Sequence, residues 1–153
     1  MNEAVIRPYR EADIEAMLEA WYEASLLAHP FLPAEFLADE AIRIRDVFLP
    51  RSQAWVYEAD GRVWGFISLL GNEVGGLFVH PARQRQGIGH ALMDQVVSLR
   101  GTIELDVFAA NPLGRAFYAA YGFVEVDRYV DEEIGQLLIR LRYDVHQQKN
   151  LSG

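Results

Sequence analysis

Two glycines, Gly87 and Gly89, follow an apolar run that ends at Val79, and Arg83 and Arg85 lie just ahead of them. The start of a helix presents unpaired backbone N–H groups and a partial positive charge, and both favour a bound anion such as phosphate. Glycine adds no side chain that would block close approach to the backbone. The stretch therefore predicts a phosphate-binding turn between a strand and a helix, and the two arginines could add charge to it.

Several phosphate-binding patterns compete for this turn. A dinucleotide fingerprint, G-x-G-x-x-G, needs a third glycine where Leu92 stands, and it normally opens a repeated βαβ domain. A P-loop needs Gly-Lys-Ser/Thr, which the turn lacks. What remains is Gln84-x-x-Gly87-x-Gly89 after a strand, and a structural turn without any ligand stays an alternative. Binding of a nicotinamide nucleotide is disfavoured.

A second pattern lies in the stretch NPLGRAFYAAYGF. Asn111 and Pro112 are typical of a helix start, and Gly122 is typical of the residue after a helix end. Tyr118 projects about 100° away from Phe117 on such a helix, so it need not belong to the core. The helical spacing predicts a buried stripe of Leu113, Ala116, Phe117 and Ala120.

Together, the two patterns make the chain resemble the GNAT superfamily of acetyl-CoA-dependent N-acetyltransferases, roughly from Ile6 to Arg142. The pyrophosphate loop of that family, Q/R-x-x-G-x-G/A after V-x-P, is matched by Val79, Pro81, Gln84, Gly87 and Gly89. Its second motif, an Asn and then A-x-x-F/L-Y-x-x-x-G-F, is matched by Asn111, Phe117, Tyr118, Gly122 and Phe123. A looser pattern resembles a small bacterial subgroup, the YjaB-like acetyltransferases, through Trp21, Ser25, His29, Phe31 and Leu32.

The resemblance implies a role for each matched residue. Backbone groups of Leu77, Phe78 and Val79 would receive the pantetheine arm and the acetyl carbonyl, and Asn111 would also reach the pantetheine. The strand ending near Val79 would splay away from the strand ending near Phe108, with the glycines of Val74–Gly76 supplying a bulge. The pyrophosphate would lie against Arg85, Gln86, Gly87, Ile88, Gly89 and His90.

Aminolysis of a thioester needs an acid, and for some amines it also needs a base. Tyr118 is the candidate acid, because a phenol with a pKa of about 10 keeps its proton at neutral pH. The base stays open between Asp106, Glu73 and His29. A lysine-like amine with a pKa of about 10.4 must lose a proton at a cost near 4.6 kcal/mol at pH 7, whereas an α-amine needs far less help.

An acceptor pocket is expected where the first two helices meet. Its candidate residues are Trp21, Ser25, His29 and Phe31, although Trp21 also fits the apolar stripe of its helix. His29 lies where the first helix should end, and a helix C-terminus favours the protonated form of a histidine.

Hydrophobic periodicity and turn residues give the element order β-α-α-β-β-β-α-β-α-β-β, a single-domain mixed α/β fold. A strand–helix–strand passage in the middle predicts one central parallel pair, and the other strands are mostly antiparallel. The second helix is expected over residues 34–48, stopping before Pro50. The domain is predicted to span residues 1–144, followed by a polar tail over 145–153.

Composition limits the classes of partner. The chain has 153 residues, no cysteine and a net charge of −8, which disfavours nucleic acid. No stretch reads as a membrane span or a signal peptide, so a cytoplasmic location is expected. Because the sequence has no cysteine and no closely spaced pair of histidines, no metal is implied. Residues 1–49 hold ten acidic residues against four arginines, so −6 of the charge lies there and favours a cationic acceptor.

The combined interpretation is an N-acetyltransferase in which a primary amine, on a small cationic molecule or a peptide, attacks acetyl-CoA directly. The alternative is a non-catalytic CoA-binding module that acts as a sensor or partner subunit. Either a monomer or a homodimer is compatible with the sequence.

Overall fold

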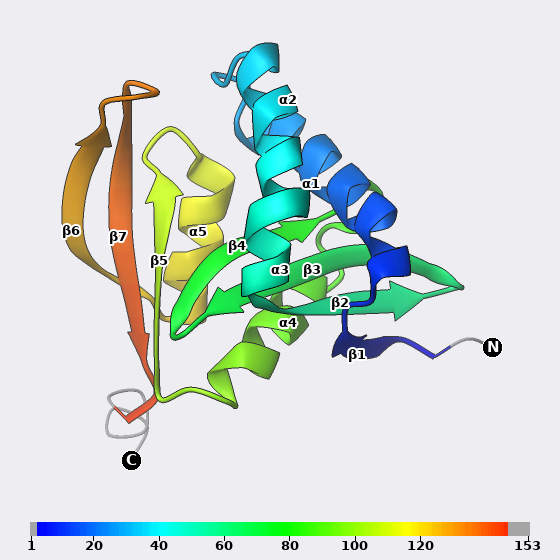
Figure 1. Ribbon diagram of the computed structural model, residues 1–153. Helices are drawn as coiled ribbons and strands as arrows, with labels where there is room; N and C mark the ends of the chain where they lie inside the picture. The colour runs from blue at the N-terminus through cyan, green and yellow to red at the C-terminus, as the bar shows by residue number, and fades with distance from the viewer. Residues whose placement is uncertain (1–2, 147–153) are drawn as a thin grey trace.

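The computed structural model describes residues 3–146, which form one seven-stranded sheet covered by helices on both faces (Figure 1). The predicted tail over 145–153 lies, from residue 147 on, outside the described residues. The strands are β1 (Val5–Pro8), β2 (Gln53–Ala59), β3 (Arg62–Leu70), β4 (Glu73–Val79), β5 (Thr102–Phe108), β6 (Val124–Asp131) and β7 (Gln136–Asp144). The helices are η1 (Glu11–Asp13), α1 (Ile14–Ala28), α2 (Ala34–Arg43), η2 (Ile44–Phe48), α3 (Leu49–Arg51), η3 (Pro81–Arg83), α4 (Ile88–Val97) and α5 (Pro112–Tyr121).

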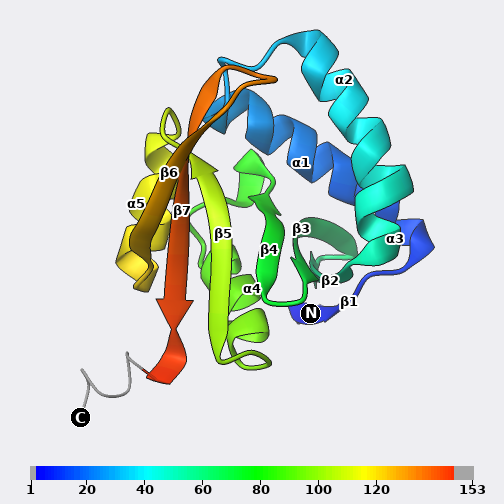
Figure 2. The ribbon, with the colours of Figure 1, turned by 60° about the vertical axis from the view of Figure 1, so that its left-hand side comes forward.

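The sheet order is β1-β2-β3-β4-β5-β7-β6, and β4 and β5 are its parallel pair. All other neighbours are antiparallel, so the predicted mixed sheet with a central parallel pair is confirmed. Helices α1 to α3 cover one face of the β2–β4 region, α4 covers the opposite face of that region, and α5 lies on the side of α4 against β5 (Figure 2). The face of β5, β7 and β6 opposite α5 carries no helix (Figure 2).

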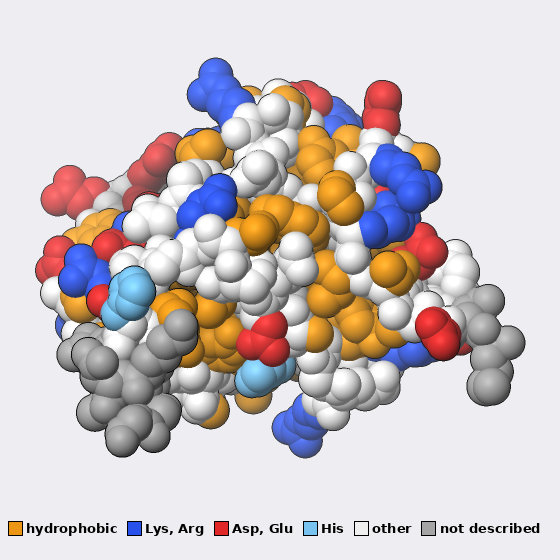
Figure 3. All heavy atoms as spheres, turned by 90° about the horizontal axis from the view of Figure 1, so that it is seen from below, with side chains coloured by type: hydrophobic (Ala, Val, Ile, Leu, Met, Phe, Trp, Pro, Cys, Tyr) orange, Lys and Arg blue, Asp and Glu red, His pale blue; other side chains and the backbone are white. Residues whose placement is uncertain are grey.

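Two hydrophobic clusters follow from these two layers. Ile67, Leu92 and Ile103 are fully buried members of the cluster under α4. Met17 and Val56 are fully buried members of the cluster under α1 and α2. No described helix has the length and apolar character to cross a membrane. Seen from below, the described residues show scattered charges and no broad basic patch (Figure 3).

The second helix does not stop before Pro50, as the sequence had predicted. Residues Ile44–Phe48 form a π-helical turn, η2, and the helical path continues through α3 to Arg51. Pro50 is the second residue of α3 and directly follows the π-helical turn, so it does not end the helical path. The helical wall facing the sheet is therefore longer than expected.

The predicted buried stripe of α5 is wrong in three of its four members. Leu113 is 52% exposed, and Ala116 and Ala120 are exposed as well. The inward side of the helix carries aromatic rings, those of Phe117, which is the fourth predicted member, and of Tyr118 and Tyr121. Small residues on an amphipathic helix carry a weak signal of which face is buried, and here the large rings decided it.

A charged network occupies the sheet face that no helix covers. Arg140 on β7 lies opposite Asp106 on β5, 3.4 Å from Nη1 to Oδ2. Its Nη2 also lies 2.8 Å from Glu73 and 3.1 Å from Glu104, so one guanidinium joins three carboxylates from two strands. Arg142, and then Arg140, hold the pKa of Glu104 below its usual value.

We expect Arg140→Met to lower the free energy of unfolding by about 2 kcal/mol at pH 7, because three carboxylates lose their shared cation. The loss is smaller than for a fully buried pair, since the Arg140 side chain is 23% exposed. The stability that Glu104 gains from its lowered pKa is present above pH 4.5 and disappears as the pH falls through the folded-state value. Urea unfolding should therefore show that the free energies of unfolding of the unmodified protein and of Arg140→Met become more similar as the pH is lowered.

Arg45→Met is the matched control, because the Arg45–Asp46 ion pair is about half exposed on both sides. Its effect on the free energy of unfolding should be much smaller than that of Arg140→Met, because water and salt screen an exposed ion pair. An Arg140→Met variant as stable as this control would contradict a stabilising role for the network.

Candidate active site

The parallel strands β4 and β5 separate soon after they begin (Figure 1). In the described chain their register joins only Glu73 with Glu104, near the start of both strands. On its other side, β4 pairs with β3, and Gly75 has no partner in that pairing. Ser68 of β3 pairs with Gly76, and the next residue, Leu69, pairs with Val74. This bulge confirms the irregularity predicted for Val74–Gly76 and bends β4 away from β5.

The gap exposes one backbone edge of β4. Leu77, Phe78 and Val79 pair with β3 on their other side, and no described strand pairs with them across the gap. These are the three residues that the resemblance assigned to the pantetheine arm, and they lie at the end of β4 as expected. Unpaired strand edges offer N–H and C=O groups to an extended ligand.

The loop from His80 to Gly87 leads from β4 into α4. Gly87 is the N-cap residue with a φ of 83°, and a Cβ added there would meet no atom within 4 Å. Arg85 is exposed, has a φ of 64° and makes no side-chain hydrogen bond or ion pair with any described residue. Gln86, Gly89 and His90 continue the turn, and Ile88 points into the core at 2% exposure. The first turn of α4 is thus open to an anion.

Arg83, in contrast, is already engaged. Its Nη2 donates to Asp60 Oδ2 at 2.8 Å, and its guanidinium stacks on the Trp64 ring at 4.2 Å from the centroid. The expectation that Arg83 could add charge to an anion site is therefore not supported by its contacts, whereas Arg85 is available.

Tyr118 sits on α5 with its ring against Phe117 and Phe123. Burial raises the pKa of Tyr118 above its ordinary value of 10, so the phenol stays protonated at neutral and mildly alkaline pH. Its hydroxyl makes no hydrogen bond with the described residues, so its proton is available to a ligand. The ring is partly buried and packs against the core cluster under α4.

Asn111 connects α5 to the end of α1. Its Oδ1 accepts the Gly114 N–H at 2.9 Å, which caps the helix and orients the amide. The Nδ2 group then lies 3.2 Å from His29 Nε2 and donates to it. Both ends of the Asn111 side chain are therefore used within the protein, and a contact to pantetheine remains a prediction.

His29 is neutral, which corrects the expectation of a protonated histidine at a helix end. Burial lowers its pKa to about 4, and this outweighs the favourable field at the C-terminus of α1. The ring packs edge-on against Phe108, 4.9 Å between centroids, and against Phe31. With Nε2 accepting from Asn111, the ring proton lies on Nδ1.

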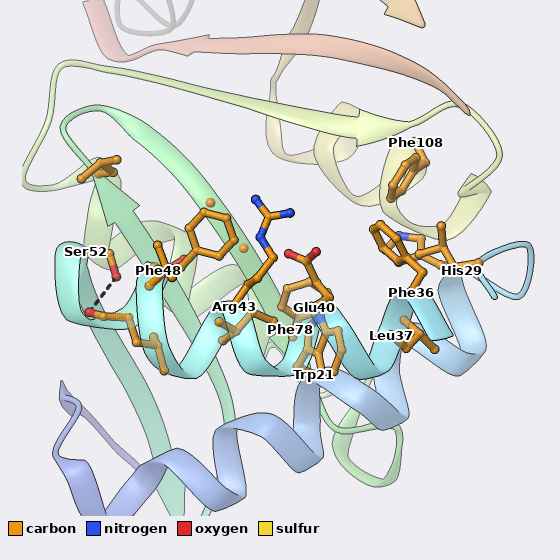
Figure 4. Close-up of a pocket in the computed structure, with 18 of the residues that line it drawn as sticks. Trp21, His29, Phe36, Leu37, Glu40, Arg43, Phe48, Ser52, Phe78 and Phe108 are labelled. Carbon is orange, nitrogen blue, oxygen red and sulfur yellow. Dashed lines mark hydrogen bonds between the residues drawn. The ribbon is translucent and has the colours of Figure 1, made fainter. Parts of the chain in front are cut away.

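A cavity of about 670 Å³ lies between the α1–α3 layer and the sheet. Figure 4 shows Glu40 and Arg43 projecting side by side from α2, with His29 and Phe108 at the opposite end from Ser52. Trp21 and His29 line it, as the sequence predicted. Ser25 is 1% exposed and does not line it, and Phe31 lies behind two lining residues, His29 and Phe108.

The sequence interpretation missed the charged groups of this cavity. The missed residues come from three parts of the chain: Glu40, Arg43, Arg51, Asp131 and Glu133. Glu73 also lines the cavity, and it is the only one of these charged residues that the sequence analysis had named as a site residue. The amphipathic pattern of residues 34–48 could have indicated the α2 members. Nothing local indicates that the β6–β7 turn closes the other side.

Both carboxylate candidates for a base contact Arg140. Glu73 lines the cavity and accepts from Arg140 Nη2 at 2.8 Å. Asp106 accepts from the Tyr129 hydroxyl at 2.7 Å, and its other oxygen is buried without a hydrogen bond. Of the two, only Glu73 borders the cavity. Among residues 3–146, no three metal-ligating side chains come together.

Comparisons with known proteins agree with this geometry. A family model described as an acetyltransferase (GNAT) domain matches residues 50–125. The peptidyl-lysine N-acetyltransferase YiaC of Escherichia coli (strain K12) is 37% identical over 124 residues, which cover 80% of this chain and 85% of YiaC. The solution structure of apo-form YjaB from Escherichia coli gives a TM-score of 0.83 at 27% identity, covering 92% of this chain and 97% of that one.

A third similarity concerns the fold alone. The crystal structure of the PaiA N-acetyltransferase from Thermoplasma acidophilum in complex with coenzyme A gives a TM-score of 0.73 at 19% identity, covering 92% of this chain and 99% of that one. The fold of this chain, with its separated parallel strands β4 and β5, is that of a GNAT acetyltransferase. The chain belongs to the GNAT acetyltransferase family.

Tyr118→Phe should lower kcat for acetyl transfer by about 100-fold, because the variant loses the only acidic proton on this ring. Thermal stability should stay unchanged, since the ring keeps its packing against Phe123. Steady-state kinetics and thermal unfolding on the same samples check both expectations.

Tyr121→Phe is the matched control on the same helix, because its hydroxyl donates to Asp94 at 2.6 Å on the α4 side. Its kcat should stay close to that of the original protein. Equal kcat values for the two variants would rule out proton donation by Tyr118.

Proposed function

We propose that this chain transfers the acetyl group of acetyl-CoA to the side-chain amine of a lysine in a peptide or protein. The observation that carries the proposal is the strand gap at Leu77–Val79, which has an open helix start at one side and a charged cavity at the other. YiaC and YjaB are named peptidyl-lysine N-acetyltransferases, which supports this class of acceptor. We assign the domain to residues 1–144 and the activity to the cytoplasm.

The residues at the start of α4 fit a pyrophosphate. Its first turn has no side-chain cap, and the space above Gly87 is open. Acetyl-CoA supplies an activated acyl carbon and a thiol leaving group. Arg85, Gln86, Gly87, Ile88, Gly89 and His90 would hold the pyrophosphate, chiefly by backbone N–H groups and the Arg85 charge.

Chemistry would then rest on positioning, on removal of one proton from the amine and on one hydrogen bond to the leaving sulfur. The free backbone edge of β4 aligns the thioester, and the cavity brings the amine to its carbonyl. Tyr118 donates a hydrogen bond to the sulfur as the carbon–sulfur bond breaks, because its raised pKa keeps the proton in place. Glu73, which borders the cavity, is the carboxylate that a lysine ammonium can reach to lose its proton.

The charges of the cavity favour a cationic acceptor. Glu40 on α2 and Glu133 on the β6–β7 turn both line it, and neither carboxylate makes a hydrogen bond or a close ion pair with the described residues. Burial raises the pKa of Glu40, and Glu133 raises it further, while Arg43 lowers it. A bound ammonium or a basic neighbour of the acceptor lysine would relieve this repulsion.

We expect calorimetric titration to show saturable binding of acetyl-CoA, weakened about tenfold by Arg85→Glu, because charge reversal opposes the phosphates near the start of α4. Arg85 is a cleaner probe than Gly89, where any Cβ would lie 3.3 Å from the Phe117 ring. Arg45→Glu changes the net charge equally at an exposed ion pair on η2 and should leave the affinity unchanged.

Absence of binding to the unmodified protein would contradict the proposed co-substrate. Binding without acetylation of any amine would instead indicate a CoA-binding module.

Glu133→Lys should raise KM for lysine peptides with basic flanking residues about fivefold, with kcat changed less, because the cavity loses one carboxylate and gains a cation. Glu132→Lys is the matched control, since this neighbour lies in the same turn but does not line the cavity. Acetylation assays on basic and acidic peptide series check this expectation. A preference for acidic peptides in the unmodified protein would overturn the cationic acceptor.

A further inference from the structure

Two arginines stack on the indole ring of Trp64 in β3. The guanidinium carbon of Arg62 lies 4.7 Å from the ring centroid and that of Arg83 lies 4.2 Å from it. The indole is fixed from its own side, because its Nε1 donates to the Ala59 carbonyl at 2.9 Å. Trp64 therefore offers the two arginines a ring whose orientation is held by the β2–β3 hairpin.

Of the two arginines, only Arg83 belongs to the loop between β4 and α4. It ends η3, and its Nη2 donates to Asp60 Oδ2 at 2.8 Å, in the turn between β2 and β3. Arg62, on β3 itself, pairs instead with Glu19 of α1 at 2.8 Å. Arg83 thus ties the loop to the hairpin by a stacking contact and an ion pair.

The first half of this loop is held at several points. The His80 N–H donates to the Trp64 carbonyl at 2.8 Å, and the Gln84 side chain donates to the Val79 carbonyl at 3.0 Å. The second half is different. No hydrogen bond joins Arg85 or Gln86 to other described residues, and Arg85 adopts a left-handed φ that non-glycine residues rarely take.

The direction in which the chain reaches Gly87 therefore depends on how Arg83 and Gln84 are held. We propose that Arg83, fixed by Trp64 and Asp60, is a positioning residue that orders loop 84–87 and so aligns the N–H groups at the start of α4 for pyrophosphate. An ordered loop loses less conformational freedom when the ligand binds, which raises affinity without any direct contact. This inference rests on the proposed use of acetyl-CoA.

The test uses Arg83→Ala and, as an independent break of the same tie, Asp60→Asn. Asparagine tolerates the φ of 54° at residue 60, so the turn is kept while the charge is removed. Calorimetry should show CoA binding about fivefold weaker in Arg83→Ala. KM for acetyl-CoA should rise while kcat stays unchanged.

Hydrogen exchange of the amides of residues 84–90, measured without ligand, should become faster in both variants. Arg62→Ala is the matched control, because it loses a stack on the same indole and an ion pair but lies outside the loop. Its CoA affinity and its loop exchange should equal those of the unmodified protein.

Unchanged CoA affinity in Arg83→Ala would overturn the inference, as would equal weakening in Arg62→Ala. Weaker binding with unchanged loop exchange would mean that Arg83 touches the ligand itself, and that also overturns the positioning role. If the unmodified protein binds no CoA, the proposed function fails, whereas loop exchange still reports separately on whether Arg83 orders the loop.

Discussion

A parallel strand pair that stays hydrogen-bonded has no backbone group free for a ligand, and β4 and β5 avoid this because they pair at Glu73 and Glu104 and then separate. The bulge at Gly75 bends β4, while β5 keeps a continuous ladder with β7. The edge of β4 at Leu77–Val79 is left unpaired between the two strands. Every other part of the site is arranged around this gap.

The charges of the open sheet face keep the two halves of the split sheet together. Arg140 reaches from β7 across Glu104 and Asp106 of β5 to Glu73 of β4, where the two parallel strands are paired. This bridge ties the strands at the end where they meet, so their other ends can diverge. A hydrophobic contact is not directional, whereas the hydrogen bonds of a guanidinium to several carboxylates fix the relative positions of the strands.

A second connection joins the helical layers at the opposite end of the gap. His29 at the end of α1 accepts from Asn111, which also caps α5. The bond needs a neutral imidazole, and burial among aromatic rings keeps His29 neutral. The helix that carries Tyr118 is thus tied to the layer that forms one wall of the cavity.

Local chemistry made the element order, the glycine turn at Gly87 and the cap at Asn111 readable from the sequence, because periodicity, turn residues and caps act over a few residues. The continuation of the second helix past Pro50 and the buried face of α5 were misread, since packing against the sheet outweighed local preference. Only the tertiary structure decided the charge of His29 and the convergence of Glu40 with Glu133. Burial and the meeting of segments distant in sequence depend on the folded chain, and no local pattern encodes them.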